Sequence, residues 1–314
     1  MRQKIAVVFP GQGSQYLGMA KDFLATSAEA RALMEQAEDL CGLPLQRLCL
    51  DGPLEELTRS VNLQPAVTVV NLICWQALGR ALPELRPHCF AGHSLGEFSA
   101  LAAAGVLDTA ATLRLVMRRG ELMEREAGLH PGGMRAVLGL ELEQVRQALT
   151  AVTGRGVVVV ANHNTAQQIV LSGDEAGLDA AAAELKGQGA KVIPLKVALA
   201  NHSPLVAGAV PDFSAALGRE TFAPPAAPVY CNVSAAAETE PLVIRDLLAR
   251  QLASPVRWYE SVGNMLAAGA EVFVEVGPKN VLSGILRKIV PASVTCLQVE
   301  SPAGIEALAA ALAG

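Results

Sequence analysis

The chain has 314 residues, of which 51% are hydrophobic and 18% are charged, and its formal net charge is −5. This length and apolar content suffice for one large core, or for a large core with a modest inserted subdomain. With no lysine-rich run, the sequence lacks the basic face that a phosphate backbone requires, so we expect no nucleic-acid partner.

A short apolar run at 5–9 leads directly into Pro10 and Gly11. The run is too short for the apolar region of a signal peptide and indicates a buried strand. The longer apolar tracts are interrupted by charges or glycine before the roughly 20 residues that a membrane helix needs. We therefore expect a cytoplasmic protein without a membrane partner.

Short strand-like runs then alternate with longer helical patterns rich in alanine and leucine, which is typical of an α/β domain on a mostly parallel sheet. The predicted strands are 4–9, 87–91, 227–231, 271–276 and 294–298. The predicted helices include 27–41, 65–81, 96–104, 108–126 and 257–268.

The segment from 132 to 197 breaks this alternation. Its predicted elements are a strand at 134–138, a helix at 141–152, strands at 156–162 and 167–172, a helix at 175–188 and a strand at 190–197. This β-α-β-β-α-β order is ferredoxin-like. We expect an α/β-hydrolase-like large domain, residues 1–131 and 198–314, with an inserted ferredoxin-like subdomain, residues 132–197, and a cleft between them.

The sequence GHSLG at 92–96 stands between a predicted strand and a predicted helix, the context of a nucleophile elbow. In such a turn the glycines permit a tight reversal, the serine hydroxyl is exposed, and the following N–H can face a developing oxyanion. Ser94 is thus the candidate nucleophile for attack on a thioester carbonyl. The alternative is an ordinary tight turn before a helix.

A serine nucleophile needs a base, and histidine is the usual one. His93 adjoins Ser94 but its side chain leaves the backbone in another direction, His88 precedes the strand, and His130 and His163 fall in or beside the subdomain. His202 lies where the chain leaves the subdomain, at the mouth of the expected cleft. We therefore take His202 as the candidate base, although a lone histidine is often structural.

Several motifs follow the order seen in malonyl-CoA:acyl carrier protein transacylases, a family that this chain resembles over nearly its whole length. They are FPGQGSQ at 9–15, LQPA at 63–66, GHSLGE at 92–97, RG at 119–120, NHS at 201–203, QLASPVRW at 251–258 and EVGP at 275–278. The resemblance implies ping-pong transfer of a malonyl group from malonyl-CoA to the phosphopantetheine thiol of an acyl carrier protein, in fatty-acid or polyketide synthesis. The intermediate is a covalent acyl-serine.

The resemblance also implies residue roles. Ser94 and His202 match the catalytic dyad, and Gln12 matches a glutamine beside the oxyanion hole, whose donors include the Leu95 N–H. A main-chain carbonyl near Gln251, rather than an aspartate, orients the histidine. From the sequence alone, Gln12 could equally be a turn residue after a strand.

Arg119 lies 25 residues beyond Ser94 on a predicted helix and matches the family arginine that binds the malonyl carboxylate. A planar guanidinium suits this task because it grips a carboxylate through two parallel bonds. Arg118 is a competitor, about 100° round the helix. Asn162 and His163 match the stretch that approaches the acyl or pantetheine group in relatives, and a plain turn is an equal alternative.

The chain departs from the family before the base, where it reads ALANH at 198–202 instead of the patterns common in relatives. Leu95 and the small Ala200 leave room for malonyl and for a substituted malonyl, since one methyl group shifts selectivity by only about 1–3 kcal/mol. The sequence therefore does not decide between malonyl and a substituted malonyl as the preferred acyl group.

Two other functions compete with the transferase. A serine hydrolase would share Ser94 and His202, but a buried arginine without a carboxylate partner gives it no advantage with neutral acyl groups. A non-catalytic scaffold that binds carrier protein conflicts with the presence of the dyad and Gln12. We expect no cofactor, because the GxG turn at 11–13 lacks the rest of a dinucleotide fingerprint, and no metal, because the six cysteines are scattered.

Overall fold

A computed structural model describes residues 3–197 and 199–313 of the chain. Its large sheet, labelled sheet A here, is parallel except at one edge, where β7 and β8 are antiparallel. The strands in order across the sheet are β10 (Thr295–Val299), β9 (Val272–Val276), β1 (Ile5–Phe9), β2 (Cys89–Gly92), β7 (Val229–Tyr230) and β8 (Ala237–Glu238). Because β1, β2, β7 and β9 run the same way, the segments that follow them meet at one edge.

Sheet A is covered on both faces, as the central strand β1 shows. Its alternate residues Val7 and Phe9 pack in one core cluster, whereas Ala6 and Val8 pack in another. A strand that is buried on both faces needs a continuous apolar run, which is what the sequence has at 5–9.

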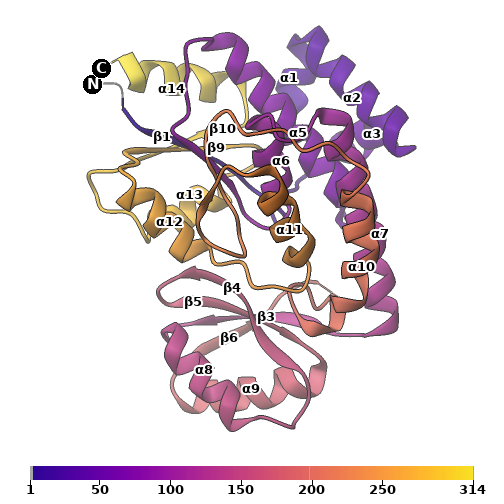
Figure 1. Cartoon of the computed structure of the whole chain (residues 1–314), viewed down its shortest axis with the longest axis vertical. Helices are drawn as coiled ribbons and strands as arrows, with labels where there is room; N and C mark the ends of the chain where they lie inside the picture. Colours follow the sequence, from indigo (N-terminus) through magenta and orange to yellow (C-terminus); the bar gives the residue numbers. More distant parts are fainter. Residues whose placement is uncertain (1–2, 198, 314) are drawn as a thin grey trace.

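Helices surround this sheet and fill most of the upper part of the molecule in Figure 1. The N-terminal half supplies α1 (Lys21–Thr26), α2 (Ala28–Cys41), α3 (Leu45–Leu50), α4 (Leu54–Thr58), α5 (Ser60–Ala81), α6 (Gly96–Ala103) and α7 (Thr109–Leu129). The C-terminal part supplies the 3₁₀ helix η1 (Pro204–Ala209), α10 (Val210–Leu217), α11 (Pro241–Gln251), α12 (Trp258–Ala267), α13 (Val281–Leu286) and α14 (Pro302–Ala313).

A separate antiparallel sheet, sheet B, lies below sheet A in Figure 1, with α8 (Leu142–Ala151) and α9 (Glu175–Gly187) on its far side. Its strands in order across the sheet are β4 (Val158–Thr165), β5 (Gln168–Gly173), β3 (Gly133–Leu138) and β6 (Lys191–Pro194). The order of elements and of strands is ferredoxin-like. The predicted fold class is confirmed, and the division at residues 131/132 and 197/198 stays a prediction.

Sheet B is joined to the large domain through its edge strand. Asn162 forms a parallel bridge to Val256, with His163 N donating to the Val256 carbonyl at 2.9 Å and Val256 N donating to the Ala161 carbonyl at 2.8 Å. These bonds connect β4 to the segment between α11 and α12, beside the carboxyl edge of sheet A.

Helix α5 differs most from its prediction, because it begins at Ser60 rather than at 65. Pro65 lies inside the helix, where it lacks one N–H, and packing overrides this loss. Gly120 of α7 approaches the backbone of Ser60 so closely that a Cβ there would overlap its carbonyl. Tertiary packing therefore extends the helix by one turn beyond the local signal.

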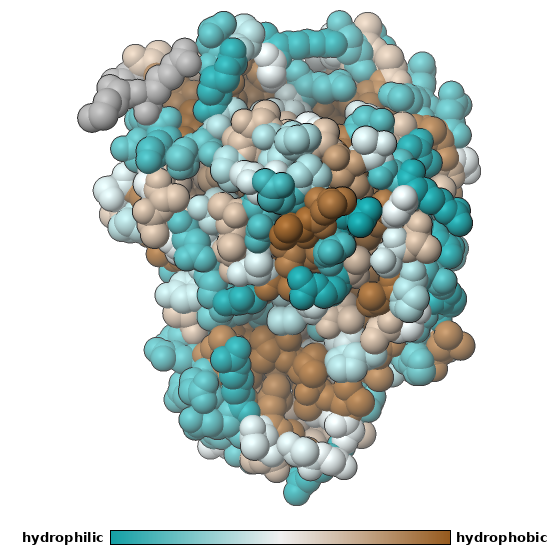
Figure 2. Space-filling view, in the orientation of Figure 1, coloured by the Kyte–Doolittle hydropathy of each residue, from teal (hydrophilic) through white to brown (hydrophobic). Residues whose placement is uncertain are grey.

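Helix α5 is also the one described helix that is long and apolar enough to cross a membrane by length and composition. The expectation that every apolar tract falls short of this length is therefore wrong for α5. Of its most apolar window, 78% is buried inside the protein, which is the burial of a core helix. Figure 2 shows where hydrophobic side chains reach the surface instead: one group lies over α11, where Leu242 and Val243 are exposed.

Candidate active site

Ser94 lies on the turn between β2 and α6 with a backbone φ of 51°, a conformation that is unfavourable for a serine. Its N–H donates to Asn232 Oδ1 at 2.7 Å, which helps to hold the turn. The flanking glycines are needed for space: a Cβ on Gly92 would overlap the main chain of Gly96, and one on Gly96 would overlap the Phe9 carbonyl. The turn therefore has the geometry of a nucleophile elbow.

His202 faces this serine, with its Nε2 at 2.7 Å from Ser94 Oγ. Its Nδ1 lies 2.9 Å from the Gln251 carbonyl and 3.0 Å from the Ser254 carbonyl. Carbonyls only accept hydrogen bonds, so Nδ1 carries the proton and Nε2 is free to accept the serine proton. Burial, reinforced by the charge of Arg119, lowers the pKa of His202 to about 3, so the ring is neutral.

The neighbouring histidines have other partners. His93 Nε2 lies 2.8 Å from Asn164 Oδ1, and the His93 ring packs edge-on against Trp258, with 5.5 Å between ring centroids. His163 Nδ1 lies 3.4 Å from Glu260 Oε2. Of these three histidines, only His202 is hydrogen-bonded to Ser94, whereas His93 and His163 contact Asn164 and Glu260.

Arg119 reaches the same place from α7 and is buried, with 2% of its surface exposed. Its Nη1 donates to Gln64 Oε1 at 2.9 Å, and its Nη2 lies 3.2 Å from both Ser94 Oγ and Gln251 Oε1. Its Nε is buried and has no hydrogen-bond partner among the described residues. The guanidinium is therefore held by neutral groups and keeps an unused donor beside the serine.

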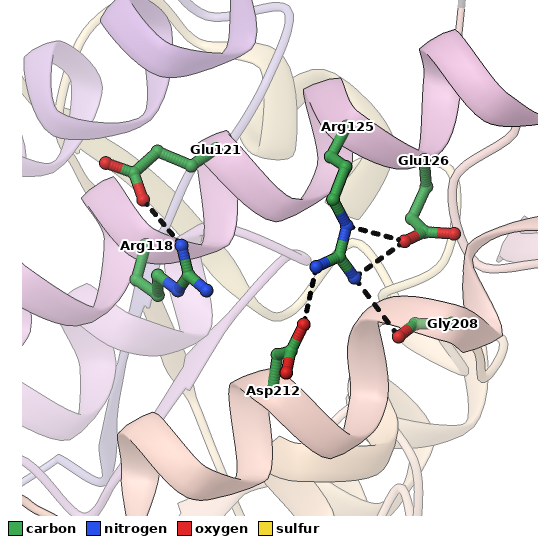
Figure 3. Close-up of polar contacts among 6 residues, drawn as sticks. All are labelled: Arg118, Glu121, Arg125, Glu126, Gly208 and Asp212. Atoms are coloured by element: carbon green, nitrogen blue, oxygen red, sulfur yellow. Dashed lines mark hydrogen bonds and ion pairs between the residues drawn. The ribbon is translucent and has the colours of Figure 1, made fainter.

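The charge of Arg119 is not neutralised by direct contact. Within residues 3–197 and 199–313, no carboxylate oxygen lies within 4.0 Å of its nitrogens. Burial lowers the pKa of Arg119 to about 10, and the more distant charge of Glu97 opposes the shift. Arg118 is different: it is half exposed and forms an ion pair with Glu121 at 2.9 Å (Figure 3).

Gln12 lies on the turn after β1, and this turn packs on the elbow. A Cβ on Gly11 would contact the His93 carbonyl, so the two turns touch through their backbones. Leu95 follows Ser94 at the start of α6 and is buried. Gln12 also lines a cavity of about 490 Å³ that extends past Ser60 and Lys196, between the large domain and the segment after β6.

Gln251, predicted only for its main-chain carbonyl, contributes its side chain as well. Its Nε2 donates to the Ser94 carbonyl at 2.9 Å and to Glu97 Oε2 at 2.7 Å. Asn162 and His163 lie in strand β4 rather than in a turn, and it is the next residue, Asn164, that contacts the elbow through His93.

Three further residues, for which the sequence motifs predicted no role, surround the site: Gln64, Glu97 and Asn232. The first two stand inside quoted motifs, but their partners lie 55 and 154 residues away. Asn232 lies two residues after the end of the short buried strand β7, and a polar residue just past the carboxyl end of a parallel strand is the signal that could have found it.

The segment that departs from the family is buried where it is described. Leu199 and Ala200 are 5% and 1% exposed, and the Oδ1 atom of the adjacent Asn201 is buried without a hydrogen-bond partner among the described residues. Ala198, the first residue of this departure, lies outside the described residues.

The fold and this geometry together define a class: α/β proteins that place a serine and a histidine as acyl-serine enzymes do. The family model described as "Acyl transferase domain" matches residues 6–299. The chain therefore belongs to the acyl transferase family.

Relatives and solved structures agree with this assignment. The malonyl CoA-acyl carrier protein transacylase of Haemophilus influenzae is 39% identical over 289 residues, which are 92% of this chain and 93% of that protein. The acyl carrier protein S-malonyltransferase structure from Vibrio cholerae has a TM-score of 0.93 at 37% identity and covers 98% of this chain and 100% of its own. A malonyl-transacylase solved with its type II PKS acyl-carrier protein has a TM-score of 0.91 at 34% identity, covering 97% and 98%.

Proposed function

We propose that the chain transfers a malonyl group from malonyl-CoA to the phosphopantetheine thiol of an acyl carrier protein through a malonyl ester on Ser94. His202 is the general base and acid, and Arg119 binds the malonyl carboxylate. Gln12 and the Leu95 N–H stabilise the oxyanion, and Gln251 orients His202. The carrier serves fatty-acid or polyketide synthesis.

The observation that carries this proposal is the environment of Arg119. A buried cation without a carboxylate in contact is unfavourable unless a ligand supplies the negative charge. Its Nη2 is 3.2 Å from Ser94 Oγ, so a carboxylate on Arg119 would belong to the same small molecule that acylates the serine. Malonyl thioesters meet this requirement, because a single methylene separates their carboxylate from the reacting carbonyl.

In the first half-reaction, Ser94 gives its proton to His202 Nε2 while Oγ attacks the thioester carbonyl. The carbonyl oxygen becomes an oxyanion that the Leu95 N–H and the Gln12 side chain stabilise. When the tetrahedral adduct collapses, the carbon–sulfur bond breaks and His202 returns the proton to the sulfur of CoA. The products are free CoA and the malonyl ester of Ser94.

The second half-reaction repeats these steps with the carrier protein. The phosphopantetheine thiol loses its proton to His202 and its sulfur attacks the ester carbonyl. The bond to Ser94 Oγ breaks, and His202 gives the proton to the serine. The main-chain carbonyls of Gln251 and Ser254 keep Nδ1 protonated throughout, so that Nε2 alternates between accepting and donating.

We further propose that the enzyme acts in the cytoplasm, with neither a membrane nor a nucleic acid as a partner. Burial of the apolar helix α5 supports this location, because the helix already has protein neighbours on most of its surface. The net charge of −5 opposes binding to phosphate backbones.

The test is the intact mass of the protein after mixing with malonyl-CoA, followed by addition of a phosphopantetheinylated carrier protein. We expect a malonyl adduct that the carrier removes, and no adduct in Ser94→Ala, because the acyl acceptor is gone. A panel of other acyl-CoAs in the same assay defines which acyl groups the site accepts.

Two results would contradict the proposal. A malonyl adduct that persists in Ser94→Ala would exclude Ser94 as the nucleophile. Release of free malonate at the same rate with and without carrier protein would identify a hydrolase instead.

A further inference from the structure

Glu97 is a buried acid that the transfer steps do not use. It is the second residue of α6 and is 1% exposed. Burial raises the pKa of its carboxyl to about 7, although hydrogen bonds from Gln251 and Asn232 oppose this shift. Burial of a carboxyl group is unfavourable unless hydrogen bonds compensate for the lost water. The hydrogen-bond partners of Glu97 therefore indicate its role.

The partners of Glu97 come from three other elements. Its Oε2 accepts hydrogen bonds from Gln251 Nε2 at 2.7 Å, at the end of α11, and from Asn232 N at 3.3 Å, after β7. The charged and titratable groups that face it are Arg119 on α7 and the thiol of Cys231. Glu97 is thus the point where α6, α7, α11 and the end of β7 meet.

Both amide residues bonded to Glu97 also hold the elbow. Asn232 accepts from Ser94 N and donates to the Gly92 carbonyl, each at 2.7 Å. Gln251 donates to the Ser94 carbonyl at 2.9 Å, and its own main-chain carbonyl lies 2.9 Å from His202 Nδ1. The nucleophile and the base therefore depend on two residues that share one carboxylate.

The Gln251 amide is oriented by Arg119, by the Ser94 carbonyl and by the carboxylate of Glu97. A guanidinium only donates, so Arg119 requires Oε1 on its side of the amide. A carboxylate only accepts, so Glu97 requires Nε2 on the other side. A protonated Glu97 no longer requires the Gln251 donor, and the amide is then held only by Arg119 and the Ser94 carbonyl.

We propose that Glu97, as a carboxylate, is a positioning residue for acyl transfer: it fixes Gln251 and Asn232, and through them Ser94, His202 and Arg119. This inference rests on the proposed function, because it assigns Arg119 and the dyad the roles given there. Glu97 itself touches neither the substrate nor the reacting atoms.

The decisive variant is Glu97→Gln, which keeps the size of the side chain and removes its charge. We expect the rate of malonyl-enzyme formation to fall about 10- to 100-fold, the scale of a small misplacement of reacting groups. The matched control is Glu126→Gln, which changes another buried acid on α7 that is bonded to Arg125 and not to the elbow. We expect this control to keep the wild-type rate.

The pH profile separates positioning from a general structural role. In the wild type, the rate of malonyl-enzyme formation should decline as the pH falls through about 7, where Glu97 becomes protonated. His202 is not expected to cause this decline, because burial and the charge of Arg119 lower its pKa well below this range. In Glu97→Gln the decline in rate near pH 7 should be absent.

The proposal is overturned if Glu97→Gln forms the malonyl enzyme at the wild-type rate with the wild-type pH profile. If Glu97→Gln does not fold, the wild-type profile decides alone, and a profile that is flat between pH 8 and pH 6 overturns the proposal. If the wild type forms no malonyl enzyme, the proposed function fails separately. Labelling of Ser94 by a fluorophosphonate over the same pH range then tests Glu97 in the same way.

Discussion

Helix α7 carries arginines on two faces, and their environments are opposite: exposed and ion-paired on the outer face, buried among neutral groups on the inner face. On the outer face, Arg118 pairs with Glu121, and Arg125 bonds to Glu126, Asp212 and the Gly208 carbonyl (Figure 3). The Arg118 and Arg125 side chains are 43% and 41% exposed. Each of these charges has an acidic partner: Arg118 pairs within α7, whereas Arg125 also joins α7 to η1 and α10 at the surface.

On the inner face, Arg119 is bonded to a serine and two glutamines. Burial lowers the pKa of Arg119 to about 10, whereas hydrogen bonds to Asp212 and Glu126 raise the pKa of Arg125. The two arginines thus differ in burial and in partners rather than in residue type or helix position, and the proposed ligand-binding role of Arg119 rests on this difference. Three predictions test this distinction, in order of decreasing effect.

The largest effect is expected at His202, the proposed base, which lies near Arg119 on the inner face of α7. His202→Ala should lower the rate of acyl-enzyme formation about 10²- to 10⁴-fold, because the serine loses its proton acceptor. The measurement is the pre-steady-state rate of malonyl adduct formation by rapid quench and mass spectrometry. His93→Ala is the control and should act only through the loss of its packing on Trp258 and of its hydrogen bond to Asn164. If it alone slowed transfer, the dyad would have to be reassigned.

The second prediction concerns Arg119 itself. Arg119→Ala should lose about 2–5 kcal/mol of preference for malonyl over acetyl, because the charged partner of the carboxylate is gone. Transfer of neutral acyl groups should be retained or increased, because the uncompensated buried cation is removed. The measurement is the ratio of malonyl to acetyl transfer onto a carrier protein.

Arg118→Ala is the matched control for this experiment, since it removes a neighbouring arginine from the outer face. It should leave the malonyl to acetyl ratio as it is and change the free energy of unfolding by less than about 1 kcal/mol. An unchanged ratio in Arg119→Ala would remove the carboxylate-binding role, and the distinction between the two faces with it.

The smallest effect is expected from Arg125→Ala, and it should appear in stability rather than in specificity. Glu126 is 2% exposed and would lose its hydrogen-bonded partner, so we expect the free energy of unfolding to fall by about 1–3 kcal/mol. Urea denaturation measures this change. A shift in the malonyl to acetyl ratio that matched Arg119→Ala would show that the outer face also serves the substrate.

Sequence patterns predicted those parts of the fold that depend on interactions between residues close in the chain. The elbow at 92–96 and the order of elements in sheet B follow from glycine spacing and strand and helix periodicity, and both are present. The first turn of α5 was missed, because it depends on the close approach of Gly120 to Ser60. Long-range packing of this kind leaves no periodic signal in the sequence.

The same limit applies to the site. Ser94 could be identified from its own turn, and His202 by elimination among five histidines. Arg119 could be preferred to Arg118 only through family resemblance, because nothing local shows that one of two adjacent arginines is buried. Asn232 was missed because its contact with Ser94 joins residues 138 positions apart.

The two glycines of the elbow also determine how such an enzyme can be redesigned or can diverge. Positions 92 and 96 have no space for a Cβ, so a library randomised across this turn would return glycine at both. Variation in the accepted acyl group is therefore expected in segments that reach the serine from elsewhere in the chain. The turn that carries Ser94 can therefore vary little, and differences in acyl specificity are expected in the segments around it.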